Sequence, residues 1–154
     1  MKPGSFTQIY VQIIFSPEHR EALLIDKIRT RVFEYIKGII ETLGHKSIIV
    51  NGCIDHVHLL IGLNPVMSVS ETVKEIKRVS SIFINSLNVS QSRFKWQEGY
   101  GAFSYSKSQL NDVYNYILNQ EEHHKKKSFR EEYLAFLKKF EIEYDEKYLF
   151  QFFD

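Results

Sequence analysis

The sequence is poor in cysteine and proline, and each shortage excludes a class of protein. A single cysteine, Cys53, can form neither an internal disulfide nor a cysteine-based zinc site. This favours a protein of the reducing cytoplasm, where we expect the chain to reside. The three prolines lie outside the helical patterns, and no linker, repeat or low-complexity segment divides the chain. We therefore expect one domain over residues 1–154.

Long hydrophobic runs and an excess charge of one sign are also absent. No apolar segment approaches the length of a transmembrane helix, and Gln8 and Gln12 interrupt the apolar start, which favours a first strand over a signal peptide. Hydrophobic residues make up 44% of the chain and charged residues 25%, an ordinary globular balance. The net charge is only +1, so any grip on nucleic acid must come from local patches.

The hydrophobic pattern predicts strands and helices in a definite order. Asn51-Gly52 predicts a turn between the second and third strands, Asp26 and Ser70 are candidate caps of the first two helices, and Ser128 with Glu131 has the pattern of a capping box. The strands are expected at residues 6–15, 46–50, 56–63 and 96–105, and the helices at 26–43, from 70 onwards, at 110–124 and at 128–142.

This order, β-α-β-β-α-β followed by helices, predicts an α+β, ferredoxin-like fold. Such a fold has one antiparallel sheet with helices packed on one face. We expect the opposite face to be free for a ligand or a partner, and a helix and tail to follow the sheet at the C-terminal end. Fold alone does not determine chemistry, so the function has to come from particular residues.

Two histidines stand two residues apart in the third predicted strand. His56 and His58 leave the same face of such a strand, roughly 6.6 Å apart at about 3.3 Å per residue, while Val57 and Leu59 point the other way, into the core. Two imidazoles at this spacing can converge on one metal ion. A pair of half-buried histidines without a metal explains an isolated motif of this kind equally well or better.

The third predicted helix adds two candidate groups. Its apolar stripe leaves Tyr116 and Gln120 on a neighbouring face, four residues and therefore one turn apart. Gln120 offers an amide oxygen as a third metal ligand, and Tyr116 offers a phenol oxygen as a nucleophile. Taken singly, Tyr116 could instead be an aromatic residue covering the sheet edge, and Gln120 a solvated helix residue.

Such a set of residues suits phosphoryl chemistry. A tyrosine hydroxyl has a reference pKa of about 10 and needs an activated electrophile. A metal held by two histidines and one glutamine keeps open positions that take a phosphate oxygen and water. Mixed nitrogen and oxygen ligands suit Mg²⁺ or Mn²⁺, and no protein carboxylate is required among the ligands, because the substrate phosphate supplies the anionic ligand.

These motifs resemble those of a known family. His56-Val57-His58 is similar to the HUH motif (histidine, hydrophobic, histidine), and Tyr116-Ile117-Leu118-Asn119-Gln120 is similar to the Y-x-x-x-Q helix of the single-tyrosine HUH transposases of the insertion-sequence-200/605 family. Residues 6–11, 96–103 and 121–124 resemble further segments of that family, in the same order. One departure is Gln12, where many relatives carry histidine in the first strand.

The resemblance implies a function, a cofactor and partners. It implies a transposase that cleaves single-stranded DNA at hairpin-marked element ends, with Tyr116 as the nucleophile that forms a 5′-phosphotyrosine. His56, His58 and Gln120 would bind Mg²⁺ or Mn²⁺. The resemblance also implies a homodimer in which the tyrosine helix of one subunit commonly completes the site of its partner.

Several residues are tentative DNA contacts. Lys74, Lys77 and Arg78 lie near one face of the second predicted helix, where they could bind backbone phosphates or simply form a solvated face. Tyr100 could stack on an unpaired base. His123 and His124 could extend the metal site or contact phosphates, or they could belong to a polar helix end.

Two alternative functions remain open at this stage. The first is a domesticated relative that processes repetitive palindromes without moving an element. The second is a non-catalytic module that binds single-stranded DNA hairpins. The intact set of His56, His58, Tyr116 and Gln120 argues against the second, and also against a simple metal hydrolase, since Asp55 is the only carboxylate beside the histidine strand.

Overall fold

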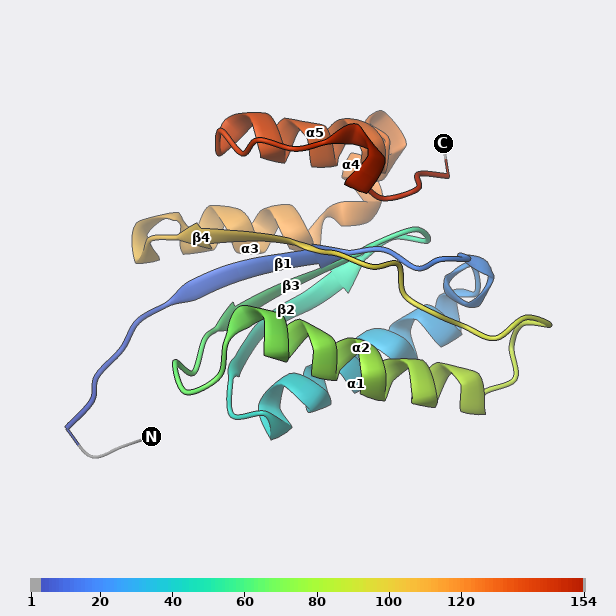
Figure 1. The fold of residues 1–154 in the computed structure, drawn as a ribbon, viewed down its shortest axis with the longest axis horizontal. Helices are drawn as coiled ribbons and strands as arrows, with labels where there is room; N and C mark the ends of the chain where they lie inside the picture. Colours follow the sequence, from blue (N-terminus) through green and yellow to red (C-terminus); the bar gives the residue numbers. More distant parts are fainter. Residues whose placement is uncertain (1–3, 154) are drawn as a thin grey trace.

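The computed structural model describes residues 4–153 and has a four-stranded antiparallel sheet between two layers of helices (Figure 1). The predicted α+β fold is confirmed, and the elements follow in the expected order. The strands are β1 (Tyr10–Phe15), β2 (Lys46–Gly52), β3 (Val57–Gly62) and β4 (Gly101–Tyr105), and the helices are α1 (Asp26–Thr42), α2 (Val69–Ser86), α3 (Leu110–Leu118), α4 (Gln120–Lys126) and α5 (Phe129–Lys139).

The sheet order is β2-β3-β1-β4, and every neighbouring pair is antiparallel. In this order β3 and β1 are central and contribute the most deeply buried residues. Gln12 lies opposite Leu60 and Phe103, and Ile14 lies opposite His58. Because neighbouring residues on one strand alternate between faces, the register places Gln12, Ile14 and His58 on the same face of the sheet.

The first helical layer, α1 and α2, covers the apolar face of the sheet (Figure 1). Val57, Leu59 and Ile61 alternate along β3 and are all fully buried, as the sequence predicted. The two helices bring aliphatic stripes against them, formed by Val32, Ile36 and Ile40 of α1 and by Val73, Ile76 and Ile84 of α2. This layer is the main hydrophobic core.

The second face of the sheet was expected to be free, and this expectation is wrong. Helices α3, α4 and α5 lie over it (Figure 1). Helix α5 buries Phe129, Tyr133 and Leu137, and an amphipathic helix must bury such a stripe against another element. Gly101 in β4 makes this packing possible, because a Cβ atom there would lie 2.8 Å from the Tyr133 hydroxyl oxygen.

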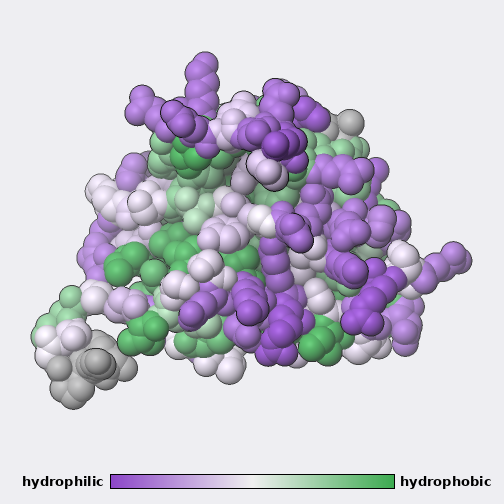
Figure 2. All heavy atoms as spheres, in the orientation of Figure 1, coloured by the Kyte–Doolittle hydropathy of each residue, from purple (hydrophilic) through white to green (hydrophobic). Residues whose placement is uncertain are grey.

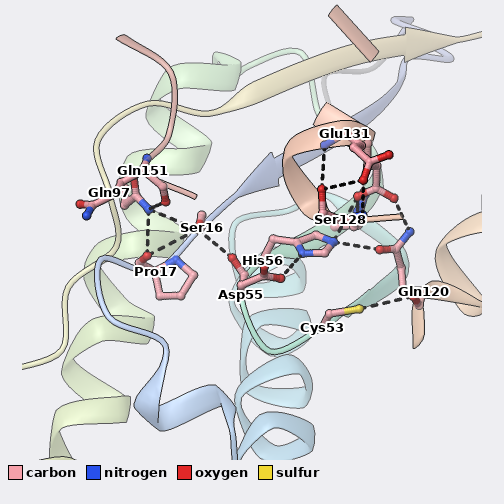
Figure 3. Close-up of polar contacts among 12 residues, drawn as sticks. Ser16, Pro17, Cys53, Asp55, His56, Gln97, Gln120, Ser128, Glu131 and Gln151 are labelled. Carbon is pink, nitrogen blue, oxygen red and sulfur yellow. Dashed lines mark hydrogen bonds and ion pairs between the residues drawn. The ribbon is translucent and has the colours of Figure 1, made fainter. Parts of the chain in front are cut away.

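The C-terminal segment after α5 returns to the sheet and holds α5 in place. Phe150 and Phe152 contact the ring of Phe129, at centroid distances of 5.9 and 5.4 Å. Gln151 exchanges two hydrogen bonds with the Gln97 side chain: Gln97 Nε2 donates to the Gln151 carbonyl at 2.8 Å, and the Gln151 amide donates to Gln97 Oε1 at 2.7 Å (Figure 3). The position of α5 therefore depends on residues far away in the sequence.

The first and the fourth strand are both shorter than predicted. The first begins at Tyr10 rather than at residue 6, because both of its neighbours end there: Tyr10 pairs with Gly62 on one side and with Tyr105 on the other. Phe6 is 90% exposed. The fourth begins at Gly101 rather than at residue 96, because Gly99 turns the chain with a φ of +85°.

Helix boundaries also differ from the prediction in three places, of which the last is the end of α5 at Lys139 rather than at residue 142. Ser68, rather than Ser70, caps α2, since its side chain accepts from the Glu71 amide at 3.0 Å. The predicted helix 110–124 is broken at Asn119, whose ψ of +27° separates α3 from α4. The capping box of Ser128 and Glu131 at the start of α5 is confirmed.

On the face shown in Figure 2, hydrophobic residues come to the surface mainly between the two helical layers, while the outer surfaces of the helices are mostly hydrophilic. Among residues 4–153, no helix combines the length and the apolar composition needed to cross a bilayer.

Candidate active site

The two histidines of the HxH motif lie side by side beneath α5. His56 directly precedes β3 and His58 is its second residue. Their ring centroids are 5.0 Å apart, and their side chains leave the face opposite to Val57 and Leu59, as predicted. They are only 1% and 0% exposed, because α5 covers them, so the site is enclosed rather than displayed on an open sheet.

Each histidine is oriented by a hydrogen bond at Nδ1. His56 Nδ1 lies 2.8 Å from Asp55 Oδ1 (Figure 3), and His58 Nδ1 lies 2.7 Å from Gln12 Oε1. Both partners are acceptors, so the two Nδ1 atoms donate and both Nε2 atoms face the interior of the site. Metal-binding histidines are commonly oriented in this way by an outer partner. The departure from the family at Gln12 therefore falls on a residue that orients a candidate ligand.

A carboxylate that the sequence analysis missed lies between the two Nε2 atoms. Glu132 of α5 is 5% exposed, and its Oε1 lies 3.2 Å from His56 Nε2 and 3.1 Å from His58 Nε2. The ligand atoms of these three residues all lie within 4.8 Å of one another. A carboxylate that the sequence analysis did not require is therefore part of the group that could hold a metal ion. A signal was present, because Phe129, Glu132 and Phe136 have helical spacing and place an acid on a buried apolar stripe.

Gln120 completes the inner group. It is 1% exposed, and its Oε1 accepts from His56 Nε2 at 2.9 Å while its Nε2 donates to Glu132 Oε2 at 3.1 Å (Figure 3). Its burial excludes the alternative of a solvated helix residue. The break at Asn119 does not remove Gln120 from the neighbourhood of Tyr116.

Tyr116 reaches the same carboxylate from α3. Its hydroxyl donates a short hydrogen bond to Glu132 Oε2. Its ring lies edge-on to His58, at a centroid distance of 6.2 Å, and stacks on His123 at 4.5 Å. One chain therefore brings all four predicted site residues together, without a contribution from a partner chain.

The electrostatics of the site depend on burial and on Glu132. Burial alone would lower the pKa of His56, but hydrogen bonds and charge from Asp55 and Glu132 outweigh it and raise this pKa to about 9. Burial lowers the pKa of His58 despite Glu132. Burial and then the Glu132 charge raise the pKa of Tyr116 well above its usual value. Burial opposes ionisation of Glu132, yet the two imidazoles hold its pKa far below the usual range.

These groups fit a divalent cation. With its pKa lowered and its Nδ1 proton donated to Gln12, neutral His58 turns an Nε2 lone pair toward the Glu132 carboxylate, so that two acceptors lie 3.1 Å apart. His56 is protonated, and its Nε2 proton lies between Nε2 and the Glu132 carboxylate. A cation between the three groups would satisfy the acceptors and replace that proton. Two imidazole nitrogens with carboxylate and amide oxygens suit Mn²⁺ or Mg²⁺.

The tentative DNA contacts have mixed surroundings. The Lys77 ammonium donates to the carbonyls of Gln97 and Gly99, at 2.8 and 2.6 Å, so it ties α2 to the loop before β4 and is not directed outward. Arg78 pairs with Glu75 at 2.8 Å.

The other tentative residues lie at the surface or beside the site. Lys74 is exposed on α2, and Tyr100 is 37% exposed beside β4. His123 stacks on Tyr116, as noted above. His124 lies 6.1 Å from the His56 ring, and its Nδ1 is buried with no hydrogen-bond partner among residues 4–153. The histidines are therefore closer to the site than the basic residues of α2.

Comparisons with known proteins found a family whose model covers most of the chain. A family model described as "Transposase IS200 like" matches residues 5–120, which include both histidines, Tyr116 and Gln120. No curated protein matches the chain.

Two solved structures have the same fold. A candidate transposase of Deinococcus radiodurans R1 superposes with a TM-score of 0.60 at 20% identity, covering 78% of this chain and 96% of its own. A REP-associated tyrosine transposase bound to a REP hairpin superposes with a TM-score of 0.58 at 12% identity, covering 80% of this chain and 74% of its own.

Proposed function

Because the chain belongs to the family of IS200-like transposases, we propose that it cleaves and rejoins single-stranded DNA through a covalent phosphotyrosine at Tyr116. One observation carries this proposal. The Tyr116 hydroxyl and the Nε2 atoms of His56 and His58 all converge on the single carboxylate of Glu132. A nucleophile and a set of cation ligands are therefore adjacent in an enclosed, polar site.

The chemical step begins at the phenol oxygen. Tyr116 Oη attacks the phosphorus of a DNA phosphodiester, the new O–P bond forms, and the bond to the 3′ oxygen breaks. The phenol proton passes to Glu132 Oε2, which already accepts it in a hydrogen bond, and the leaving 3′ oxygen takes up a proton from water. Because the raised pKa keeps Tyr116 protonated at rest, the proton leaves as the oxygen attacks.

Four residues would hold the metal cofactor that this chemistry needs. We infer that His56, His58, Glu132 and Gln120 bind Mn²⁺ or Mg²⁺, which would polarise the phosphate and stabilise the charge that develops on it. Asp55 and Gln12 orient the two imidazoles from behind. The product is a 5′-phosphotyrosine and a free 3′-hydroxyl, which reverses the reaction by attacking the same or another phosphotyrosine bond.

We propose single-stranded DNA that carries a hairpin as the substrate. The support is indirect: a structural neighbour with the same fold is bound to a REP hairpin. The family resemblance implies a homodimer, yet one chain already contains every group that the cleavage step uses. A dimer would therefore serve strand transfer or hairpin binding rather than completion of the site.

The test uses hairpin oligonucleotides with randomised single-stranded flanks, labelled at the 3′ end, incubated with the protein and Mn²⁺ and separated on a denaturing gel. We expect a labelled band at the mass of protein plus DNA, because the 5′-phosphotyrosine retains the 3′ segment. Tyr116→Phe should lose this band entirely. Tyr114→Phe is the matched control, because Tyr114 is a half-exposed tyrosine of the same helix, and it should retain the band.

Two outcomes would contradict the proposal. A covalent band that survives in Tyr116→Phe would show that another residue is the nucleophile. A wild-type protein that retards the hairpins on a native gel but never forms the band would favour the non-catalytic binding module.

A further inference from the structure

A cavity of about 360 Å³ lies between α3 and α5, directly beside Tyr116. Val113 of α3 and Ala135 and Phe136 of α5 form its apolar walls, and Gln12 and Tyr105 line it from the sheet. Its volume falls at the small end of the roughly 300–1,000 Å³ in which proteins hold small molecules. The cavity is therefore suited to one compact ligand rather than to a stretch of polymer.

The cavity has the chemical character of a site for a flat heterocycle. Phe136 and Tyr105 supply aromatic rings, on which an unpaired base can stack. Gln12 and Tyr105 are joined by a hydrogen bond of 2.8 Å, from Gln12 Nε2 to the Tyr105 hydroxyl oxygen. The Tyr105 hydroxyl is thus held in place and keeps its own proton for a ligand. The Asp112 carboxylate also lines the cavity and can accept from an exocyclic amino group.

The cavity shares residues with the proposed reaction centre. Tyr116 and Glu132, whose side chains are hydrogen-bonded to each other, both line it. Gln12 contacts the cavity and also orients His58, at 2.7 Å. A ligand in the cavity is consequently next to the attacking oxygen, and its immediate covalent neighbour would lie at the proposed metal ligands.

Two cationic side chains line the same cavity. Lys127 follows the end of α4 and Lys139 ends α5, and both are exposed. These ammonium groups favour a ligand with a phosphate group, which would lie near the lysines while the rest of the ligand lies against the apolar walls. An apolar slot, a fixed polar end and two cations together match the parts of a nucleotide: the base, its hydrogen-bonding edge and its backbone.

We propose that this cavity takes the unpaired base of a nucleotide that directly flanks the scissile phosphate. The proposal rests on the proposed function and deepens it, because it adds a direct contact between the protein and a base next to the cleaved bond. Seating the base between α3 and α5 fixes the adjoining phosphate against Tyr116, so the cavity positions the reacting atoms and discriminates among bases by fit.

The first test measures binding without catalysis. Methyl NMR signals of Val113 and Ala135 are followed while each of the four deoxynucleoside monophosphates is added, with deoxyribose 5-phosphate and inorganic phosphate as probes that lack a base. We expect both methyl signals to shift with at least one nucleotide and not with the two base-free probes. Equal shifts with all probes, or none with any nucleotide, would overturn the proposal.

The second test fills the cavity. Ala135→Trp occupies the space from an exposed position, so the fold should tolerate it, and Lys138→Trp adds the same ring at an exposed α5 residue outside the cavity. We expect Ala135→Trp to slow formation of the covalent band about 10- to 100-fold, the loss expected for one stacked base, and to abolish the nucleotide-induced shift of the Val113 methyl signals, which this variant retains. Lys138→Trp should leave both unchanged. Equal rates in the two variants would overturn the proposal.

The third test separates this proposal from the proposed function. An abasic residue is placed at each position flanking the cleavage site. With the wild type, the abasic residue at one position should slow formation of the covalent band by a similar factor. With Ala135→Trp the same abasic residue should slow it no further, because the abasic residue and the tryptophan remove the same contact. If the covalent band forms through Tyr116 but no abasic position matters, only the cavity proposal fails. If nucleotides bind in the cavity but Tyr116→Phe retains the band, only the proposed nucleophile fails.

Discussion

The two faces of the central sheet are made from alternate residues of the same strands, yet only one of them carries buried polar groups among its apolar residues. On β3, Leu59 and Ile61 face α1 and α2 in an aliphatic core, whereas His58 faces α5. On β1, Ile13 is in the core, whereas Gln12 bonds His58. All of these side chains are buried, so exposure does not distinguish the two faces.

The difference teaches how this chain divides stability and chemistry. Aliphatic burial stabilises in proportion to the area removed from water. Buried polar groups cost free energy unless each finds a partner, and here Glu132 accepts from the His56 imidazole, the Gln120 amide and the Tyr116 phenol at once. Burying polar groups on this face costs stability that aliphatic residues would have supplied. A functional site is expected on such a face.

The largest expected effect comes from Glu132→Gln, which keeps the shape of the polar face and removes its charge. We expect formation of the covalent band to slow on the order of 10²- to 10⁴-fold, because the variant loses both a proton acceptor and a cation ligand. Quench-flow rates with Mn²⁺ and circular dichroism would check rate and fold. A variant that reacts faster than the wild type would show that Glu132 blocks the site instead of serving it.

The matching change on the apolar face is Leu59→Ala. Leu59 is fully buried, so the cavity left behind should lower the free energy of unfolding by about 2–5 kcal/mol. The rate of the covalent step per folded molecule should not change. Urea titration gives the first quantity and active-site titration the second. A loss of chemistry without a loss of stability would contradict the division between the two faces.

A smaller effect, on metal affinity, is expected for Asp55→Asn, because the Asp55 side chain acts on the site only through His56. Asp55 Oδ1 accepts from His56 Nδ1, and loss of such an orienting carboxylate typically reduces metal affinity about 10- to 100-fold. Isothermal titration with Mn²⁺ measures it. Asp112→Asn, at an exposed carboxylate outside the proposed ligand set, serves as the control and should bind Mn²⁺ like the wild type.

The smallest expected step is the change in metal affinity over a single pH unit. The pKa of His56 is raised to about 9, so below that pH its Nε2 carries a proton that a cation must displace. Affinity for Mn²⁺ should therefore rise by about tenfold per pH unit up to about pH 9 and then level off, and each ion bound should release one proton at neutral pH. Titrations in buffers of different ionisation enthalpy count the protons. An affinity independent of pH from 6 to 8 would exclude His56 as a ligand.

The sequence alone predicted the apolar face and half of the polar one. Alternation along β3 and the four-residue spacing of Tyr116 and Gln120 are local patterns. The first is confirmed, and the second brings the two residues together although the helix predicted to hold both is broken at Asn119. Glu132 was missed because it stands in a charged run with Arg130 and Glu131, which has the appearance of a solvated helix face. Its burial follows from the docking of α5, and that docking depends on long-range contacts.

Those long-range contacts also explain the error about the free face. The Gln97–Gln151 hydrogen bonds join residues that are 54 positions apart in the sequence. The packing of Phe150 on Phe129 joins the C-terminal segment to α5. No periodicity within one helix records such a contact. The burial of Phe129 and the small size of Gly101 acquire their meaning only once α5 is seen against the sheet.

The measurement that tests the central claim most directly is to locate the DNA on the protein. The covalent complex formed with Mn²⁺ is digested with nuclease and trypsin, and the nucleotide-bearing peptide is sequenced by tandem mass spectrometry. The account predicts a nucleotide 5′-phosphate on the Tyr116 oxygen, formed in the wild type and lost when Mn²⁺ is chelated. A nucleotide on Tyr114 or any other residue, or a Tyr116 adduct that forms equally well with no divalent cation, would contradict it.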